Sequence, residues 1–311
     1  MPPGLSYPAL KCVLEFLDAP QRIHITARTP SLKQIDKVIP LRVKYLLIDD
    51  FTLRFNEFFM TCTPVNVMFG VWRTQKVLHE SICPNRFSFN NNRDKLFESY
   101  FGARSIIYVD WLVSATGMYK PKSPQNFNFI INRLNTNNFG DFMPITNQFP
   151  MKELKIEAIT EILLDHPVVH SAKNIIIEQV VSSIDTYLPD IHKLRAKNVS
   201  IQYSFKYDPV FTRIPYDLIR IIKYWIDHGK EIGTKYKFTS SFDDIYAVMT
   251  EAKREFNEFL SEAEKVDERV LIDLPQFYIP MKYDLSAKIF VYGIKIQEDG
   301  GDKSQVVVKV I

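Results

Sequence analysis

Residues 154–201 read LKIEAITEILLDHPVVHSAKNIIIEQVVSSIDTYLPDIHKLRAKNVSI, and this stretch decides the fold class. It contains three short apolar segments, at residues 154–156, 175–177 and 199–201, and each suits a buried β-strand. Helical pieces separate the segments. The stretch therefore predicts a mixed α and β protein.

The region that follows continues this alternation. Residues 215–229 have the apolar spacing of an amphipathic helix, and residues 236–238 suit a further strand. Residues 241–263 predict a second long helix, which begins with the capping-box sequence Ser241-Phe242-Asp243-Asp244. Residues 289–311 predict a terminal β-hairpin.

The apolar segments at residues 154, 175 and 199 recur after 21 and 24 residues. This spacing lies within the roughly 20–29 residues of a leucine-rich repeat. The longer helix that precedes residues 236–238 breaks the period. We therefore predict that residues 151–311 form an irregular leucine-rich-repeat-like α/β layer that ends in the hairpin.

Residues 41–150 predict a β-rich middle region. Apolar residues alternate in residues 43–53, where a turn separates two strands, and residues 105–109 suit a buried strand. Residues 119–150 are rich in Asn, Pro and Phe, which predicts an irregular connection or edge structure. The three tryptophans lie in apolar sequence and are expected in the core, at positions Trp72, Trp111 and Trp225.

Residues 1–40 predict a short helical head. Leu10, Val13, Leu14 and Leu17 stand at i, i+3, i+4 and i+7, which places them in one stripe on a helix. A second short element follows at residues 22–27. The predicted organisation is thus a helical head, a β-rich middle and a repeat-like α/β region.

The composition indicates a globular, intracellular protein. Its 311 residues are 46% hydrophobic and 13% aromatic, which suffices for a core. We find no targeting segment and no apolar stretch long enough to cross a membrane. Three widely spaced cysteines do not suggest a disulfide framework. We expect the protein in the cytoplasm or nucleus.

The charge distribution argues against nucleic-acid binding. Residues 1–150 have six more basic than acidic side chains, and residues 151–311 have three more acidic than basic ones. The basic residues of the first half are scattered singly, whereas a surface that follows phosphates needs clustered Lys and Arg.

No catalytic motif is evident. The sequence has no Gly-rich phosphate loop, no serine nucleophile elbow and no HExxH sequence. Cys and His do not occur at the paired spacings of a zinc site. We therefore expect no enzymatic activity, no cofactor, no metal and no small-molecule ligand. A catalytic site built from residues distant in sequence stays open.

The amino-terminal segment resembles an F-box, the helical module by which substrate receptors attach to the Skp adaptor subunit of cullin-type SCF ubiquitin ligases. The residues that carry the resemblance are Leu5, Leu10, Val13, Leu14, Leu17, Arg22, Ile23, Ile25, Arg28, Ser31 and Leu32. The resemblance implies a Skp-type adaptor as a partner. It implies adaptor-binding residues at Leu5, Leu10, Val13, Leu14, Leu17, Ile23 and Ile25.

The whole chain is similar to a nematode-expanded domain-of-unknown-function family whose members begin with an F-box-like segment, the F-box-associated type of protein. The stretches that carry this similarity are residues 5–15, 101–110, 165–169, 224–226, 231–234 and 291–293. The biochemistry of that family gives no mechanism.

Two functions stay open. In the first, the chain is a non-enzymatic protein-binding protein that acts as a substrate receptor, with the head on an adaptor and the remainder on an unknown target protein. In the second, the apolar stripe packs on the chain's own β layer, because such stripes usually face the core. The chain is then a self-contained protein-interaction module with no ubiquitin-ligase role.

Overall fold

The computed structural model describes residues 6–49, 51–63, 66–74, 76–82, 97–98, 100–114, 128–136, 151–157, 164–181, 191–205, 213–257, 261–262, 274–282, 284, 286–298 and 301–311. The chain divides into two compact units, Met1–Met151 and Lys152–Ile311. The predicted head and middle region both fall within the first unit. The predicted class, mixed α and β with amino-terminal helices and a β-rich body, is confirmed.

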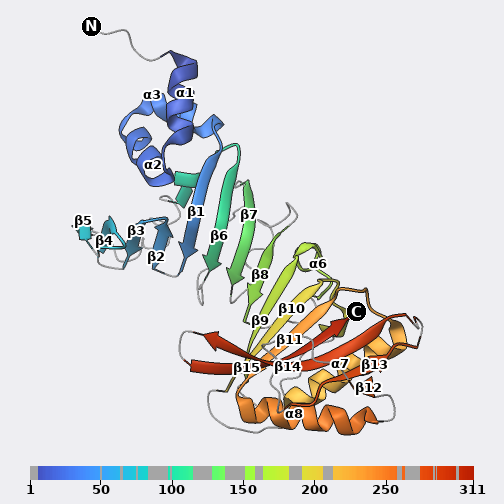
Figure 1. The fold of residues 1–311 in the computed structure, drawn as a ribbon. Helices are drawn as coiled ribbons and strands as arrows, with labels where there is room; N and C mark the ends of the chain where they lie inside the picture. The colour runs from blue at the N-terminus through green and yellow to red at the C-terminus, as the bar shows by residue number, and fades with distance from the viewer. Residues whose placement is uncertain are drawn as a thin grey trace. The chain divides into compact units, whose positions relative to one another are not determined.

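Three short helices form the head: α1 (Tyr7–Phe16), α2 (Ala19–Arg28) and α3 (Pro30–Val38) (Figure 1). A proline stands at the first or second position of each helix, where its missing N–H costs nothing and its fixed φ suits helical backbone. Pro30 also separates α2 from α3, because the residue before a proline avoids helical backbone, and Thr29 is extended. The third helix was not predicted separately.

The sheet of the first unit has the strand order β7-β6-β1-β2-β3-β4-β5. Strands β7, β6 and β1 run parallel, whereas β1 to β5 form an antiparallel meander. The strands are β1 (Leu41–Ile48), β2 (Thr52–Phe55), β3 (Phe58–Cys62), β4 (Asn66–Val71), β5 (Lys76–Ile82), β6 (Ile107–Ser114) and β7 (Phe129–Thr136).

Strand β7 corrects the prediction for residues 119–150. We expected irregular structure there, yet Phe129–Thr136 pairs with β6 along its length. The Asn-rich composition disguised the strand, because its polar residues Asn132, Arg133 and Asn135 are half-buried and alternate poorly with the buried apolar ones. Arg133 Nη2 contacts Asp110 Oδ2 at 2.7 Å, and Asn132 Nδ2 donates to Asp110 Oδ1 at 3.3 Å. Apart from residues 128–136, that stretch lies outside the described residues.

The second unit has the strand order β12-β13-β14-β15-β11-β10-β9-β8. Its strands are β8 (Glu153–Ile156), β9 (Asn174–Val181), β10 (Asn198–Phe205), β11 (Lys235–Ser240), β12 (Ser261–Glu262), β13 (Phe277–Pro280), β14 (Lys288–Glu298) and β15 (Gly301–Val310). Its helices are α6 (Pro167–Ser171), the 3-10 helix η4 (Ile191–Lys193), α7 (Arg213–His228) and α8 (Phe242–Glu255). Helix α8 packs on α7 and on strands β11, β14 and β15 (Figure 1).

The three apolar segments of residues 154–201 are confirmed as strands β8, β9 and β10. They run parallel and in register, so that Leu154, Ile175 and Val199 lie side by side, and Tyr236 of β11 continues the row. All four side chains are buried. The terminal hairpin is confirmed as well, and its strand β15 lies between β14 and β11.

Helix α8 begins as predicted but ends earlier. The Ser241 hydroxyl accepts a hydrogen bond from the Asp244 N–H at 3.3 Å, which caps the helix. The prediction that the helix reaches residue 263 is wrong, because Ser261–Glu262 pairs with β13 as β12. Strand pairing overrides the helical periodicity at this point.

The prediction that all three tryptophans lie in the core is correct only for Trp225. Its ring is fully buried and meets the Tyr236 ring edge-on, with 4.9 Å between the centroids. Trp72 and Trp111 are partly exposed. The Trp111 ring contacts side chains of neighbouring strands. The Arg133 guanidinium carbon lies 5.3 Å from the centre of the ring, and the centre of the Tyr45 ring lies 5.5 Å from it.

We predict that Trp225→Ala destabilises the protein by about 3–5 kcal/mol, because it leaves a large cavity between α7 and β11. The free energy of unfolding in urea measures the effect. The matched control is Lys223→Ala on the same helix, which removes only an exposed ion pair with Glu255 and should cost less than about 1 kcal/mol. Equal losses for the two variants would contradict the assignment of Trp225 to the core.

Candidate functional site

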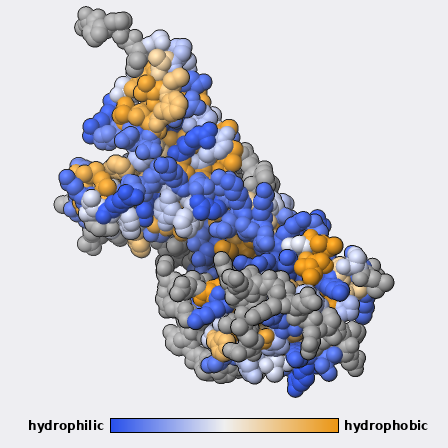
Figure 2. Space-filling model, in the orientation of Figure 1, coloured by the Kyte–Doolittle hydropathy of each residue, from blue (hydrophilic) through white to orange (hydrophobic). Residues whose placement is uncertain are grey.

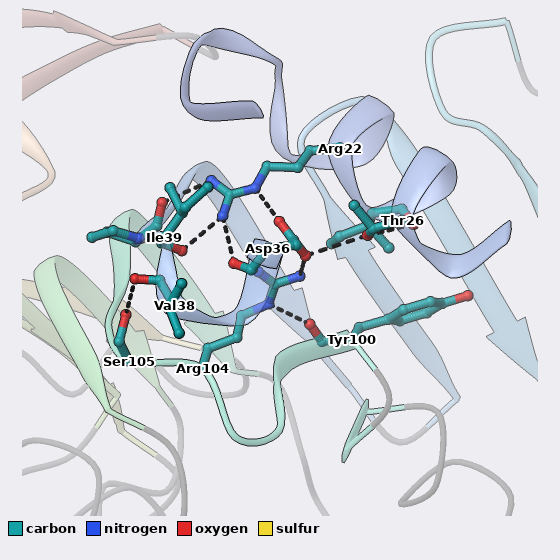
Figure 3. Close-up of polar contacts among 10 residues, drawn as sticks. Arg22, Thr26, Asp36, Val38, Ile39, Tyr100, Arg104 and Ser105 are labelled. Atoms are coloured by element: carbon teal, nitrogen blue, oxygen red, sulfur yellow. Dashed lines mark hydrogen bonds and ion pairs between the residues drawn. The ribbon is translucent and has the colours of Figure 1, made fainter. Parts of the chain in front are cut away.

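A buried polar network joins the head to the sheet of the first unit (Figure 3). At its centre, Asp36 of α3 forms an ion pair through Oδ1 with Arg22 Nε of α2, and both side chains are buried. Arg22 also donates from Nη1 to the Pro40 carbonyl at 2.8 Å and from Nη2 to the Ile39 carbonyl at 2.7 Å. These bonds tie α2 to the backbone where the chain enters β1.

A second arginine completes the network. Arg104, which precedes β6, contacts Asp36 Oδ2 through Nη2 at 2.5 Å and donates from Nε to the Tyr100 carbonyl at 2.7 Å. The Thr26 hydroxyl donates to the same carboxylate oxygen at 3.3 Å. Asp36 thus bridges three separate segments of the chain (Figure 3).

The network has an uneven charge. Two guanidinium groups share one carboxylate, so its three ionic side chains together have one excess positive charge. Burial lowers the pKa of Arg22, Asp36 opposes this shift, and the nearby Arg104 charge lowers the pKa further. Glu15 on α1 exerts a weak opposing attraction.

We predict that Asp36→Ala destabilises the first unit by about 3–5 kcal/mol, because it leaves two buried guanidinium groups without their shared carboxylate. Urea unfolding followed by circular dichroism gives the magnitude. The control is Asp18→Ala in the same head, because Asp18 is exposed and its side chain makes no capping hydrogen bond. A loss below about 1 kcal/mol for Asp36→Ala would show that the network does not hold the head in place.

Helix α1 carries apolar side chains on two adjoining faces. Leu14 is only 2% exposed and belongs to the core of the head. Phe16 is 89% exposed, Tyr7 is 58% exposed and Val13 is 45% exposed. We call the surface formed by Leu10, Val13, Phe16 and Leu17 the α1 patch; Tyr7 lies on the opposite side of the helix from Phe16, because nine residues at about 100° each separate them. Figure 2 shows hydrophobic residues gathered on this part of the head.

The residues that the F-box resemblance assigned to adaptor binding differ in their exposure. Leu10 and Leu17 are half-buried at the margin of the α1 patch, and Val13 lies within it. Leu14 and Ile23 are buried within the head, whereas Ile25 on α2 is exposed. Leu5 lies outside the described residues. Phe16 was missed, although it stands three residues after Val13 and the helical spacing could have included it.

Two neighbouring cavities open beside α2 in the first unit. The larger, about 470 Å³, lies between α2 and strands β2 to β5, and we call it the apolar groove. The smaller, about 150 Å³, lies between α2, α3 and the Tyr100 to Arg104 segment, and we call it the basic pocket. Ile23 and Tyr100 line both cavities, so the two lie side by side. Neither cavity was predicted from the sequence.

Within the part of the chain that the structure describes, no three His, Cys, Asp or Glu side chains lie close enough together to hold a metal ion. No described helix is long and apolar enough to cross a membrane.

One lysine of the second unit has a strongly shifted pKa. Lys230 Nζ donates to the Leu194 carbonyl at 2.5 Å and to the His192 carbonyl at 3.3 Å. It also lies 6.0 Å from the centre of the Trp225 ring. Burial lowers the pKa of Lys230 to about 8, against a weak upward effect from Glu231. These contacts join the segment just after α7 to η4 and to Leu194, which follows η4.

We predict that Lys230 makes stability depend on pH. Its pKa is about 8 when folded and about 10.5 when unfolded, so the unfolded chain binds more protons between these values. The free energy of unfolding, relative to Lys230→Met, should therefore rise from pH 8 to about 10.5. Urea unfolding of both proteins at pH 7.5, 9 and 10 tests this. A constant difference would mean that the Lys230 pKa is not lowered.

Comparison with known proteins gives one match. Residues 90–241, just under half of the chain, match the family model described as a domain of unknown function, DUF3557. The matched segment includes Arg104, strands β6 to β11 and helix α7, and it leaves out α1, α2 and α3. Neither the curated proteins nor the solved structures gave a significant match.

Proposed function

We propose that this chain is a non-enzymatic protein-binding protein whose head acts as an F-box-like module. In this proposal the α1 patch docks on a Skp-type adaptor, and the remainder of the chain presents a surface to a target protein. The protein would then be a substrate receptor of a cullin-type SCF ubiquitin ligase. The observation that carries the proposal is the exposure of Phe16 and its apolar neighbours on α1.

The physical support is the cost of leaving such a surface in water. Burial of a Phe side chain is worth about 1.5–3 kcal/mol, and the exposed Phe16 forgoes this gain unless a partner covers it. Aromatic residues with apolar neighbours are also typical of the energetic centre of protein interfaces. Contiguous exposed apolar patches commonly mark such interfaces.

The buried network provides the second support. A docking surface gains affinity when its shape is fixed before binding, because less conformational freedom is then lost. The Arg22–Asp36–Arg104 contacts attach α2 and α3 to the sheet, and α1 packs on α3. The α1 patch is therefore held in a fixed position by the helices beneath it, which are attached to the sheet.

The proposal also includes a family, a repeat-like layer and a cellular compartment. We assign the chain to the nematode-expanded family with F-box-like amino-terminal segments, which the match to a domain of unknown function supports in its coarser part. We propose that residues 151–311 form a leucine-rich-repeat-like layer, supported by four parallel strands in sequence order. We also place the protein in the cytoplasm or nucleus, because the proposed partners act there.

One observation favours the alternative function, a self-contained protein-interaction module with no ubiquitin-ligase role. Leu14 and Ile23, two of the residues assigned to adaptor binding, are buried in the core of the head. They are therefore not accessible to an adaptor unless the head rearranges. Under this alternative the partner that covers the α1 patch is a different protein.

We predict that the full chain co-purifies with a Skp adaptor and that Val13→Asp/Phe16→Asp abolishes the complex. Both substituted positions are exposed, so the variant should unfold at the same urea concentration as the wild type. A charge at the centre of an apolar interface should weaken binding at least about a hundredfold. Co-expression with pull-down, followed by calorimetric titration, measures this.

The control is an equally large charge change on α1 outside the patch, Lys11→Asp, which should keep the complex. Failure of the folded wild type to bind a Skp adaptor would reject the receptor function and favour the self-contained module. Binding that survives Val13→Asp/Phe16→Asp would show that the adaptor uses another surface.

A further inference from the structure

The basic pocket carries more positive charge than its own carboxylate can balance. Lys33, Lys37 and Arg104 line it together with Asp36. Both oxygens of Asp36 are already engaged, Oδ1 by Arg22 and Oδ2 by Arg104. An anion that enters the pocket would meet two lysines and the buried guanidinium of Arg104. It would also offset the excess positive charge of the network behind it.

The adjoining apolar groove is lined mostly by apolar side chains, whereas charged side chains line the basic pocket. Phe55, Met60 and Phe69 from the meander form its floor, and Ile23 forms the wall that it shares with the basic pocket. Its charged and titratable lining residues are His24, Arg28, His79 and Tyr100, and none of the residues that line it is a carboxylic acid. The groove therefore suits apolar side chains that come from an acidic rather than a basic segment.

A β-bulge shapes the edge of the groove. Phe69 of β4 pairs with His79 of β5, whereas Gly70 pairs with Val77, so Leu78 is an extra residue without a partner in β4. A bulge redirects side chains that would otherwise alternate between the two faces of a strand. Leu78 and His79 are successive residues, yet both line the groove. Leu78 is half exposed, so a bound partner can contact its side chain.

We propose that the two cavities together bind a linear segment of a partner protein that carries an acidic side chain next to apolar side chains. The acidic group enters the basic pocket, and the apolar side chains lie in the groove beyond Ile23 and Tyr100. This inference rests on the proposed protein-binding function and names the chemistry of the target. Charge complementarity selects this occupant, because Lys33, Lys37 and Arg104 line the basic pocket, and the formal charge among the residues that line the groove is that of Arg28.

The test is a selection of displayed random twelve-residue peptides on the full chain, followed by binding measurements with synthetic copies of the recovered peptides. We expect the recovered peptides to share an acidic residue beside apolar residues. Lys33→Glu/Lys37→Glu should weaken their binding at least about tenfold, and Leu78→Asp should do the same through the groove. Both variants change exposed or half-buried side chains, and circular dichroism confirms their folding.

The matched control is Lys11→Glu/Lys44→Glu, which changes the net charge equally at exposed positions that line neither cavity, and it should bind within about twofold of the wild type. Val13→Asp/Phe16→Asp should also keep peptide binding, so loss of the adaptor and loss of the peptide are separate results. The inference is overturned if no acidic and apolar pattern is recovered, or if peptides bind both cavity variants as tightly as the control.

Discussion

The first unit depends on a single carboxylate. Asp36 binds Arg22 with one oxygen and Arg104 with the other, and 68 residues separate Asp36 from Arg104 in sequence. Buried charges are stable only when they are paired and hydrogen-bonded, so this contact specifies one arrangement of α2, α3 and the start of β6. The main features of the first unit's surface follow from it.

Because the network fixes α2 and α3, it also decides which side of α1 remains exposed. Helix α1 packs on α3 with Leu14 inward, which leaves Phe16 and Val13 facing outward. The basic pocket is lined by Asp36 and Arg104 of the same network. The apolar α1 patch and the basic pocket with its adjoining apolar groove thus both depend on the Arg22–Asp36–Arg104 network. A receptor needs two such surfaces, because its adaptor and its target must bind at the same time.

Much of the fold could be predicted from local patterns. The segments at Leu154, Ile175 and Val199 are apolar, short and regularly spaced, and the capping sequence at Ser241 fixes the start of α8. Strand β7 could not be predicted, since its polar residues pair across strands with Asp110 and resemble a loop in composition. The end of α8 depends on pairing with β13, which no local pattern encodes.

The site was predictable only in part. Helical spacing placed Leu10, Val13, Leu14 and Leu17 on one stripe, but which edge of the stripe is covered depends on α3. The network and the two cavities join residues far apart in the chain, so sequence spacing could not reveal them. The measurement that tests the central claim most directly is hydrogen exchange of the full chain with and without a Skp adaptor. We expect added protection in residues 7–17, where α1 would be covered. Unchanged exchange there, with the adaptor in saturating excess, would contradict a docking role for the head.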